Sequence, residues 1–415
     1  MGKLCYLRPF IWLLVVLLIG FAAWKVYARG SIHQLFEFSA GDSSLTASID
    51  SSILQLSSRG YQLLSGDDSI LAGEDFEPHK SGQLKSKFKV FGWYPYWVDP
   101  AYEALNYDLL WGIAYFGYEI NPDDGSYTTI RNWDSTAMID SAQAHNCKVY
   151  LSLINFGTYP NHKFLNDTAA QENLITQTIA LLKQRNATGA VVDFEQISKV
   201  NRDVFSSFIV RLSQALHKEN FELVVTLYAV DHNQVFDIGK LYPVADHFVM
   251  MGYGYSYAKS LNAAPNAPLS GTLYNLEESV TYYLKQGLPK DQFIVALPYF
   301  GNVWEVLDSE KGARTKSFVS SAHYNRLSEY DTAQALLDKE TDSKYLSYEV
   351  DSQWHQLWYD DEETLNRKQQ WIKQQGLAGM GIWALGYDHG TKELWALIRK
   401  NFGKPKPIRD TSSVQ

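Results

Sequence analysis

The sequence is poor in the residues that metal and phosphate chemistry requires. It has two cysteines, Cys5 and Cys147, in 415 residues. No Cys/His cluster has metal-ligand spacing, and no glycine-rich phosphate loop follows a predicted strand, so we expect no metal ion and no cofactor. A hydrophobic segment lies between the two cysteines, and if it spans a bilayer the thiols are on opposite sides. An internal disulfide is then excluded, and the redox compartment stays open.

Positive charge is also scarce outside the amino terminus. The chain has 37 Lys and Arg against 46 Asp and Glu, a net charge of −9. The first 29 residues hold Lys3, Arg8, Lys25 and Arg29 and no acid, so the remainder carries −9 − 4 = −13. A domain this acidic repels phosphate backbones and anionic lipid headgroups, which argues against nucleic acid as a partner.

One long uncharged apolar run is present, at residues 9–24, bounded by Arg8 and Lys25. With the stem of Lys25 it is long enough to cross a bilayer core of about 30 Å. Residues 1–29 are therefore expected to form a single-pass signal anchor, with the rest of the chain outside the cytoplasm, in the periplasm or at the cell surface. A cleavable signal peptide shares the basic start and apolar centre and would make the protein secreted. Bulky Trp24 and charged Lys25 make the cleavage pattern poor, which favours the anchor.

The composition after the anchor divides the chain into three further parts. Residues 30–87 are rich in Ser, Gly and Asp and are expected to form a spacer. Residues 88–403 form the main domain, and residues 404–415 are a flexible tail.

The main domain alternates short apolar runs with amphipathic stretches. In the helix expected over 201–220, for example, apolar residues recur on one stripe. Eight strand-like runs begin at Phe88, Trp111, Cys147, Gly189, Glu222, His247, Gln292 and Gly379. Strands that alternate with helices imply a parallel sheet, and eight such units predict a closed (β/α)8 TIM barrel.

The domain is longer than a typical barrel of about 250 residues. The surplus lies between the seventh and eighth runs, at about 304–365, where YLSYEV and HQLWYDD look like extra strands. We expect a small α+β insertion over the active-site face.

Two carboxylates stand at the end of the fourth run, VVDFE. Because side chains two apart share one face of a strand, Val191, Asp193 and Glu195 are expected to point into the barrel. Two inward acids about 7 Å apart along the strand should titrate as a coupled pair, so that one keeps its proton near neutral pH. An isolated Asp-x-Glu is a weak signal, and a structural or chance origin is equally open at this point.

The other strand ends carry aromatic residues, in a chain with 12 Trp and 27 Tyr. Any one of them is explained by core packing, but their recurrence predicts an elongated, aromatic-floored groove suited to a polysaccharide. The strand-end residues are Tyr94, Tyr96, Trp97, Tyr115, Tyr118, Asn155, Tyr228, Asp231, Tyr253, Tyr255, Tyr299, Trp304, Trp383 and Tyr387.

In these positions the chain resembles glycoside hydrolase family 18, the chitinase-type barrels, over about 88–402. It is similar above all to the branch of spore-cortex and peptidoglycan-lytic glucosaminidases. The family pattern Asp-Gly-x-Asp-x-Asp-x-Glu aligns with Thr188–Glu195, and Met-x-Tyr-Asp aligns with Met251–Gly254. Pro-Tyr-x-Gly aligns with Pro298–Gly301, and the final GIW with Gly381–Trp383.

The resemblance implies a retaining hydrolase of β-linked N-acetylglucosamine polymers, such as peptidoglycan or chitin-like glycans. Glu195 would be the proton donor, Asp193 would stabilise the acetamido group of the substrate, and Tyr253 would hold its oxygen. Trp383 would stack beneath the reacting sugar. Further substrate-binding residues are expected among the other strand ends: Tyr299, Asn155, Tyr228, Tyr255 and Trp97.

Three positions depart from the family pattern: Thr188 and Val191 replace aspartates, and Gly254 replaces the aspartate after Tyr253. Valine cannot form the hydrogen bond that a carboxylate at position 191 would make to Asp193. These departures predict a slow or specialised enzyme. They also keep open a catalytically weak or inactive chitinase-like protein that binds glycan from a membrane anchor. A purely structural barrel would leave the strand-end aromatics unexplained.

Overall fold

A computed structural model describes residues 83–85 and 87–404. The expected membrane anchor (1–29), nearly all of the expected spacer and all but the first residue of the tail lie outside the described residues. Within the described ranges, no helix has the length and apolar character needed to span a membrane.

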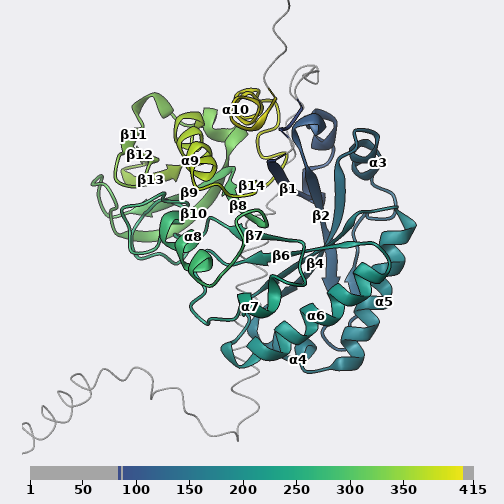
Figure 1. The fold of residues 1–415 in the computed structure, drawn as a ribbon. Helices are drawn as coiled ribbons and strands as arrows, with labels where there is room; N and C mark the ends of the chain where they lie inside the picture. The colour runs from purple at the N-terminus through teal and green to yellow at the C-terminus, as the bar shows by residue number, and fades with distance from the viewer. Residues whose placement is uncertain (1–82, 86, 405–415) are drawn as a thin grey trace, which may run out of the picture. The chain divides into compact units, whose positions relative to one another are not determined.

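Eight parallel strands form a closed barrel, as predicted (Figure 1). Going round, the order is β1-β14-β8-β7-β6-β5-β4-β2, and pairing of β1 with β2 closes the ring. All eight predicted runs contain a barrel strand. The strands are β1 (Lys89–Pro95), β2 (Gly112–Ile120), β4 (Lys148–Phe156), β5 (Gly189–Glu195), β6 (Glu222–Leu227), β7 (His247–Met251), β8 (Phe293–Pro298) and β14 (Gly379–Trp383).

Helices follow most of the strands and cover the outside of the barrel (Figure 1). The α-helices are α3 (Ala137–Ala144), α4 (Thr158–Leu165), α5 (Thr168–Gln184), α6 (Arg202–Lys218), α7 (Ile238–Leu241), α8 (Leu276–Lys285), α9 (Glu362–Gln374) and α10 (Glu393–Phe402). Three short 3-10 turns, η2 (Tyr96–Val98), η3 (Ala101–Ala104) and η4 (Tyr107–Leu109), take the place of a helix after β1. A short β3 (Tyr127–Thr129) pairs antiparallel with the end of β2.

Side-chain size explains how the barrel interior fills. Phe91 and Tyr150 point inward near the amino-terminal ends of the strands, with ring centroids 5.9 Å apart. Gly112 leaves them room, because a Cβ there would come within 2.9 Å of the Tyr150 ring. On the outside, α6 buries the predicted apolar stripe, including Phe208 and Leu212, against the sheet.

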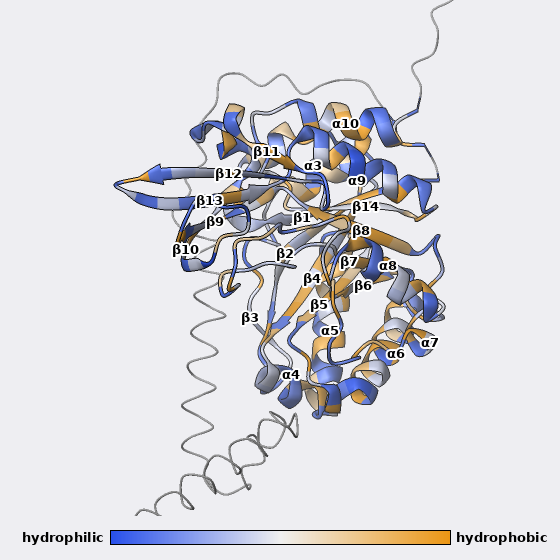
Figure 2. Cartoon of the chain, turned by 90° about the vertical axis from the view of Figure 1, so that its left-hand side faces the viewer, coloured by the Kyte–Doolittle hydropathy of each residue, from blue (hydrophilic) through white to orange (hydrophobic). Residues whose placement is uncertain are grey.

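The insertion between β8 and β14 is an antiparallel five-stranded sheet of order β10-β9-β13-β12-β11. Its strands are β9 (Phe300–Val306), β10 (Thr315–His323), β11 (Leu336–Asp338), β12 (Ser343–Val350) and β13 (Gln353–Tyr359). Figure 2 shows the β12–β13 hairpin projecting beyond the barrel, and these are the two extra strands predicted from the sequence.

The prediction that the insertion contains an α-helix is wrong. Between β9 and β13 the chain forms only two 3-10 turns, η6 (Tyr324–Glu329) and η7 (Thr332–Gln334), besides the strands. The polar sequence of η6 and η7 has no apolar stripe that could pack a longer helix. The insertion also starts earlier than predicted, at Phe300, and gives way to α9 at Glu362.

Candidate active site

Asp193 and Glu195 both face the barrel interior at the carboxyl end of β5. Phe194, between them, points outward and packs against Phe164 of α4 and Phe208 of α6, with ring centroids 5.8 and 5.7 Å away. The Asp193 side chain is only 2% exposed, whereas Glu195 is partly open to solvent. The predicted alternation along β5 therefore places both acids at the mouth of the barrel.

Burial sets the protonation of this pair. Loss of water raises the pKa of Asp193 above the ordinary value, and the hydroxyl of Thr226, 3.1 Å from Asp193 Oδ1, opposes that rise. The pKa of Glu195 is raised by burial and also by the neighbouring charge of Asp193. A carboxyl with a raised pKa keeps its proton near neutral pH, which a general acid needs.

Val191 lies two residues before Asp193 on the same inward face of β5. It fills the barrel interior and is fully buried. Its register partner on β4 is Ser152, whose hydroxyl is buried and has no hydrogen-bond partner among the described residues. Val191 thus lies directly beneath Asp193 in the barrel interior, as the alternation along β5 predicts, and its side chain offers Asp193 no hydrogen bond.

Tyr253 follows β7 and lies beside the two acids. Its pKa is raised well above the ordinary value by burial and by the charges of Asp193 and Glu195. Its ring contacts that of Phe300 at the start of the insertion, at 6.1 Å. The three residues with predicted catalytic roles are therefore brought together.

Trp383 ends β14 and belongs to a chain of aromatic rings at the mouth. Its ring centroid lies 5.1 Å from that of Phe116, which lies 5.9 Å from that of Trp97. The indole N–H of Trp97 donates to the hydroxyl of Tyr387 at 3.4 Å. The Tyr387 hydroxyl also contributes to the raised pKa of Tyr253, so this chain of rings reaches the carboxylate side of the site. In this structure Trp383 is 7% exposed.

Two predicted substrate-binding residues, Asn155 and Tyr299, lie elsewhere. Asn155 pairs in register with Phe194 and shares its helix-facing side of the sheet. Burial and the charge of Asp388 raise the pKa of Tyr299, which places its hydroxyl toward the loop after β14. The main-chain N–H of Tyr299 donates to the carbonyl of Trp383 at 2.7 Å, so its contact with the site is through the backbone.

Tyr255 and Tyr228 use their hydroxyls within the protein. The Tyr255 hydroxyl donates to Ser279 of α8 at 2.7 Å. The Tyr228 hydroxyl donates to the carbonyl of Phe194 at 3.0 Å and accepts from the N–H of Ile197 at 3.1 Å. Tyr228 therefore binds the main chain on either side of Glu195, and we interpret it as a support for the site.

Sequence reasoning missed Thr226, Phe116 and Phe156. Phe156 pairs in register with Glu195 and stacks near Phe116, at 6.4 Å, so both phenylalanines line the mouth. The alternation of side chains along β6 could have identified Thr226, because it lies two residues before Tyr228 and therefore points into the barrel as Tyr228 does. Alternation could not have placed the end of β2 reliably, because a register irregularity falls between Phe116 and Tyr118.

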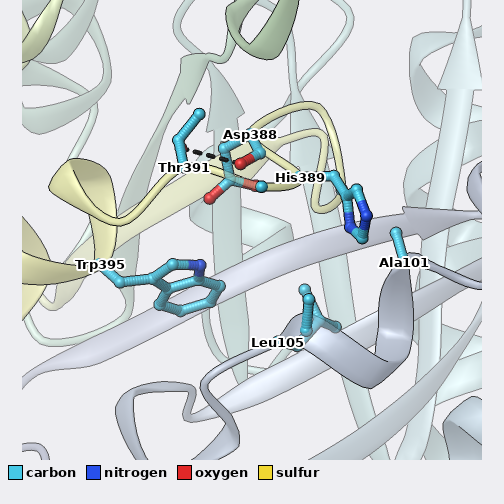
Figure 3. Close-up of a pocket in the computed structure, with 9 residues that line it drawn as sticks. Ala101, Leu105, Asp388, His389, Thr391 and Trp395 are labelled. Atoms are coloured by element: carbon cyan, nitrogen blue, oxygen red, sulfur yellow. Dashed lines mark hydrogen bonds between the residues drawn. The ribbon is translucent and has the colours of Figure 1, made fainter. Parts of the chain in front are cut away.

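A separate small cavity lies between the loop after β1 and the loop after β14 (Figure 3). Asp388, His389 and Trp395 line it together with Leu105, and burial raises the pKa of Asp388 to about 7. Asp193 and Glu195 do not line this cavity, so it is distinct from the carboxylate site. The described residues contain no group of three or more His, Cys, Asp or Glu that could hold a metal ion.

The family model of glycosyl hydrolases family 18 matches residues 93–388, from the middle of β1 through the insertion and past β14. The chain belongs to family 18. The matched segment contains Asp193, Glu195, Tyr253 and Trp383, and it ends just beyond β14.

Curated relatives and solved structures agree with this assignment. The chain is 25% identical over 255 residues to the Bacillus subtilis protein named as a sporulation-specific glycosylase, YdhD, covering 60% of this chain but only 58% of YdhD. It is 22% identical over 326 residues to a cortical fragment-lytic enzyme of Bacillus anthracis, covering 73% of this chain and 70% of that enzyme. A Cycas revoluta family 18 chitinase solved with (GlcNAc)4 superposes with a TM-score of 0.66 at 17% identity, covering 75% and 98% of the two chains. At that identity the likeness shows the fold.

The structure gives a physical reason for one departure from the family 18 pattern. Gly254 has a φ of +78°, a left-handed conformation that glycine adopts freely and a β-carbon strains. Its N–H donates to the side-chain oxygen of Asn266 at 2.9 Å, which fixes the turn after Tyr253. The glycine is therefore suited to the path of this loop.

Proposed function

We propose that the protein is a retaining hydrolase of β-linked N-acetylglucosamine polymers that uses the acetamido group of its substrate as nucleophile. The observation that carries the proposal is the pair of Asp193 and Glu195 at the barrel mouth, beside Tyr253. The raised pKa values of Glu195 and Tyr253 support a mechanism that needs a protonated acid, an acceptor and a hydroxyl at one place, and membership of family 18 supports the reaction class.

The first step begins with Glu195 in its protonated form. It gives its proton to the glycosidic oxygen while the bond from that oxygen to the anomeric carbon breaks, and the leaving sugar departs as an alcohol. The acetamido oxygen of the substrate forms the new bond to the anomeric carbon, giving an oxazolinium ion. The anionic form of Asp193 accepts the acetamido N–H and stabilises the positive charge, and the hydroxyl of Tyr253 orients the acetamido oxygen.

The second step returns the site to its starting state. A water molecule attacks the anomeric carbon while Glu195, now a carboxylate, takes a proton from it. The bond to the acetamido oxygen breaks, and the released sugar has the configuration of the substrate. Two inversions at one carbon therefore give net retention.

Peptidoglycan or a chitin-like chain is the proposed glycan. The relative named as a cortical fragment-lytic enzyme supports the former, and the plant chitinase solved with (GlcNAc)4 supports the latter. Trp383 and Trp97, joined through Phe116, provide flat apolar faces for sugar rings.

We also propose that residues 1–29 anchor the protein in a membrane with the barrel outside the cytoplasm. The apolar run between Arg8 and Lys25 supports this proposal. Cell fractionation tests it: the full chain should sediment with membranes, and protease added to spheroplasts should digest the barrel. A mature protein found in the medium and lacking residues 1–29 would show instead that the segment is cleaved.

Val191 and Gly254 favour a second candidate, a catalytically weak or inactive glycan-binding protein. Both positions have lost the carboxylates that the family pattern carries near Asp193 and Tyr253, and Thr188 has lost a third. Such a protein would hold glycan at the same mouth without cleaving it.

One comparison distinguishes the two candidates. The wild type and Glu195→Gln are assayed on N-acetylglucosamine oligomers and on peptidoglycan sacculi, and binding of (GlcNAc)4 is measured for both by calorimetry. Hydrolysis is expected for the wild type and a loss of at least about 100-fold for the variant, since the amide cannot donate the catalytic proton. No hydrolysis by the wild type, with equal binding by both proteins, would establish the binding protein instead.

A further inference from the structure

The main chain of Glu195 is paired with β4 but not with β6. Pairing between β5 and β6 ends at Val192 and Val225, so the backbone from Asp193 onward lacks ladder partners on β6. Directly after Glu195, Gln196 takes a left-handed conformation with a φ of +62°, which is costly for a residue with a β-carbon. The strand end that presents the proton donor therefore needs support from other groups.

Tyr228 supplies that support from the β6 side. Its hydroxyl donates to the carbonyl of Phe194 at 3.0 Å and accepts from the N–H of Ile197 at 3.1 Å. These two main-chain groups flank Glu195 and Gln196, so one side chain bridges the turn. The carbonyl of Ile197 in turn accepts from the side-chain amide of Asn233 at 3.0 Å.

Asn161 supplies the support from the β4 side. It lies in α4, is 0% exposed, and its amide group donates to the carbonyl of Glu195 at 2.5 Å and to that of Gly157 at 2.9 Å. The N–H of Gly157 also reaches the carbonyl of Glu195, at 3.2 Å. The backbone of the proton donor is thus held by one buried side chain, Asn161, and one partly buried side chain, Tyr228, from the two neighbouring units of the barrel.

We propose that Asn161 and Tyr228 are positioning residues that clamp the backbone of Glu195 from opposite sides and fix its carboxyl at the barrel mouth. Neither residue needs to touch substrate for this role. The inference rests on the proposed function of Glu195, and it assigns both residues a part in that reaction through the main chain alone.

The test uses the full chain with Tyr228→Phe and Asn161→Ala. Tyr107→Phe and Asn275→Ala are the matched controls: they remove a buried hydroxyl bonded to the carbonyl of Tyr102 at 2.9 Å and a buried amide bonded to that of Thr272 at 2.8 Å. Both clamp variants should lose kcat by about 10- to 100-fold with KM within about two-fold, because a small displacement of a catalytic group has that effect on rate. The control variants should keep the kcat of the wild type, even if their melting temperatures fall by as much as those of the clamp variants.

A second readout does not depend on turnover. Carbon-13 NMR of labelled glutamate carboxyls follows the titration of Glu195, assigned by its loss in Glu195→Gln. In the clamp variants the carboxyl should move toward water, and its pKa should fall toward the ordinary glutamate value. An unchanged titration together with an unchanged kcat, or losses no larger than those of the controls, would overturn the clamp. If the wild type is inactive, the proposed function fails, and a shifted titration in the variants still supports the clamp.

Discussion

The hydroxyl of Thr226 lies 3.1 Å from Oδ1 of Asp193 and 3.0 Å from the carbonyl of Val192. It is the contact that favours the ionised form of a carboxylate otherwise deprived of water. Because Val191 offers no polar group from below, the charge of Asp193 depends strongly on this one hydroxyl.

Thr226→Val is therefore expected to lower kcat/KM by about 10- to 150-fold, since a hydrogen bond to a charged group contributes about 1.5–3 kcal/mol. The variant removes the interaction that lowers the pKa of Asp193, so the acidic limb of the pH–rate profile should move to higher pH. Thr178→Val, a buried threonine of α5 whose hydroxyl has no partner among the described residues, is the matched control. An acidic limb that stays in place would contradict the role given to Thr226.

Glu195→Gln is expected to stabilise the fold above neutral pH. The folded-state pKa of Glu195 lies above its unfolded value, so the folded protein binds more protons and its stability falls as pH rises through that range. The glutamine variant avoids this cost, which is about 1–3 kcal/mol for such a carboxyl. Its melting temperature should exceed that of the wild type by a few degrees at pH 8 and match it near pH 4. Equal melting temperatures at both pH values would contradict the raised pKa of Glu195.

Val191→Asp tests whether the missing carboxylate limits the rate. Ser152, the register partner of Val191, offers the new side chain a buried hydroxyl, and Asp193 lies directly above it. We expect kcat to rise several-fold at a cost of about 1–3 kcal/mol in stability, the penalty for a partly satisfied buried polar group. Denaturant unfolding and initial rates are measured on the same samples. A folded variant with a lower kcat would show that valine suits this site better than aspartate.

Trp383→Phe should weaken binding more than it slows the reaction. The smaller ring keeps the contacts with Phe116 and Trp93 but offers less surface to a sugar. We expect the Kd for (GlcNAc)4, measured by calorimetry, to rise by about 3- to 10-fold, from a loss of about 1 kcal/mol. Trp133→Phe is the control and should leave Kd unchanged. It removes a buried indole whose N–H donates to the carbonyl of Leu181 in α5. A Kd that does not change in Trp383→Phe would remove this indole from the sugar site.

The sequence contains enough information to predict the barrel, because short apolar runs recur eight times and amphipathic stretches separate most of them. It also predicts the orientation of Asp193 and Glu195, since alternation along a straight strand fixes which side chains point inward. The same alternation, and not the polarity of a side chain, decides which other strand residues face the acids. Asn155 and Tyr299 point away from the acids because each lies at the opposite parity of its strand from the inward residues, and polarity alone does not reveal that.

Hydrogen-bond partners are harder still to predict from sequence. Tyr228 has inward parity, yet its hydroxyl is used by the main chain of Phe194 and Ile197, because β5 and β6 separate before their ends. Asn161 contributes from a helix that follows a different strand. Such contacts depend on where two strands diverge, which follows from the packing of the whole barrel.

The most direct test of the account is the anomeric form of the sugar first released from an N-acetylglucosamine oligomer. Proton NMR distinguishes the α and β hemiacetals before they interconvert. The account predicts that the wild type releases the β-anomer first and that Glu195→Gln releases almost none. Initial release of the α-anomer, or equal release by the two proteins, would contradict it.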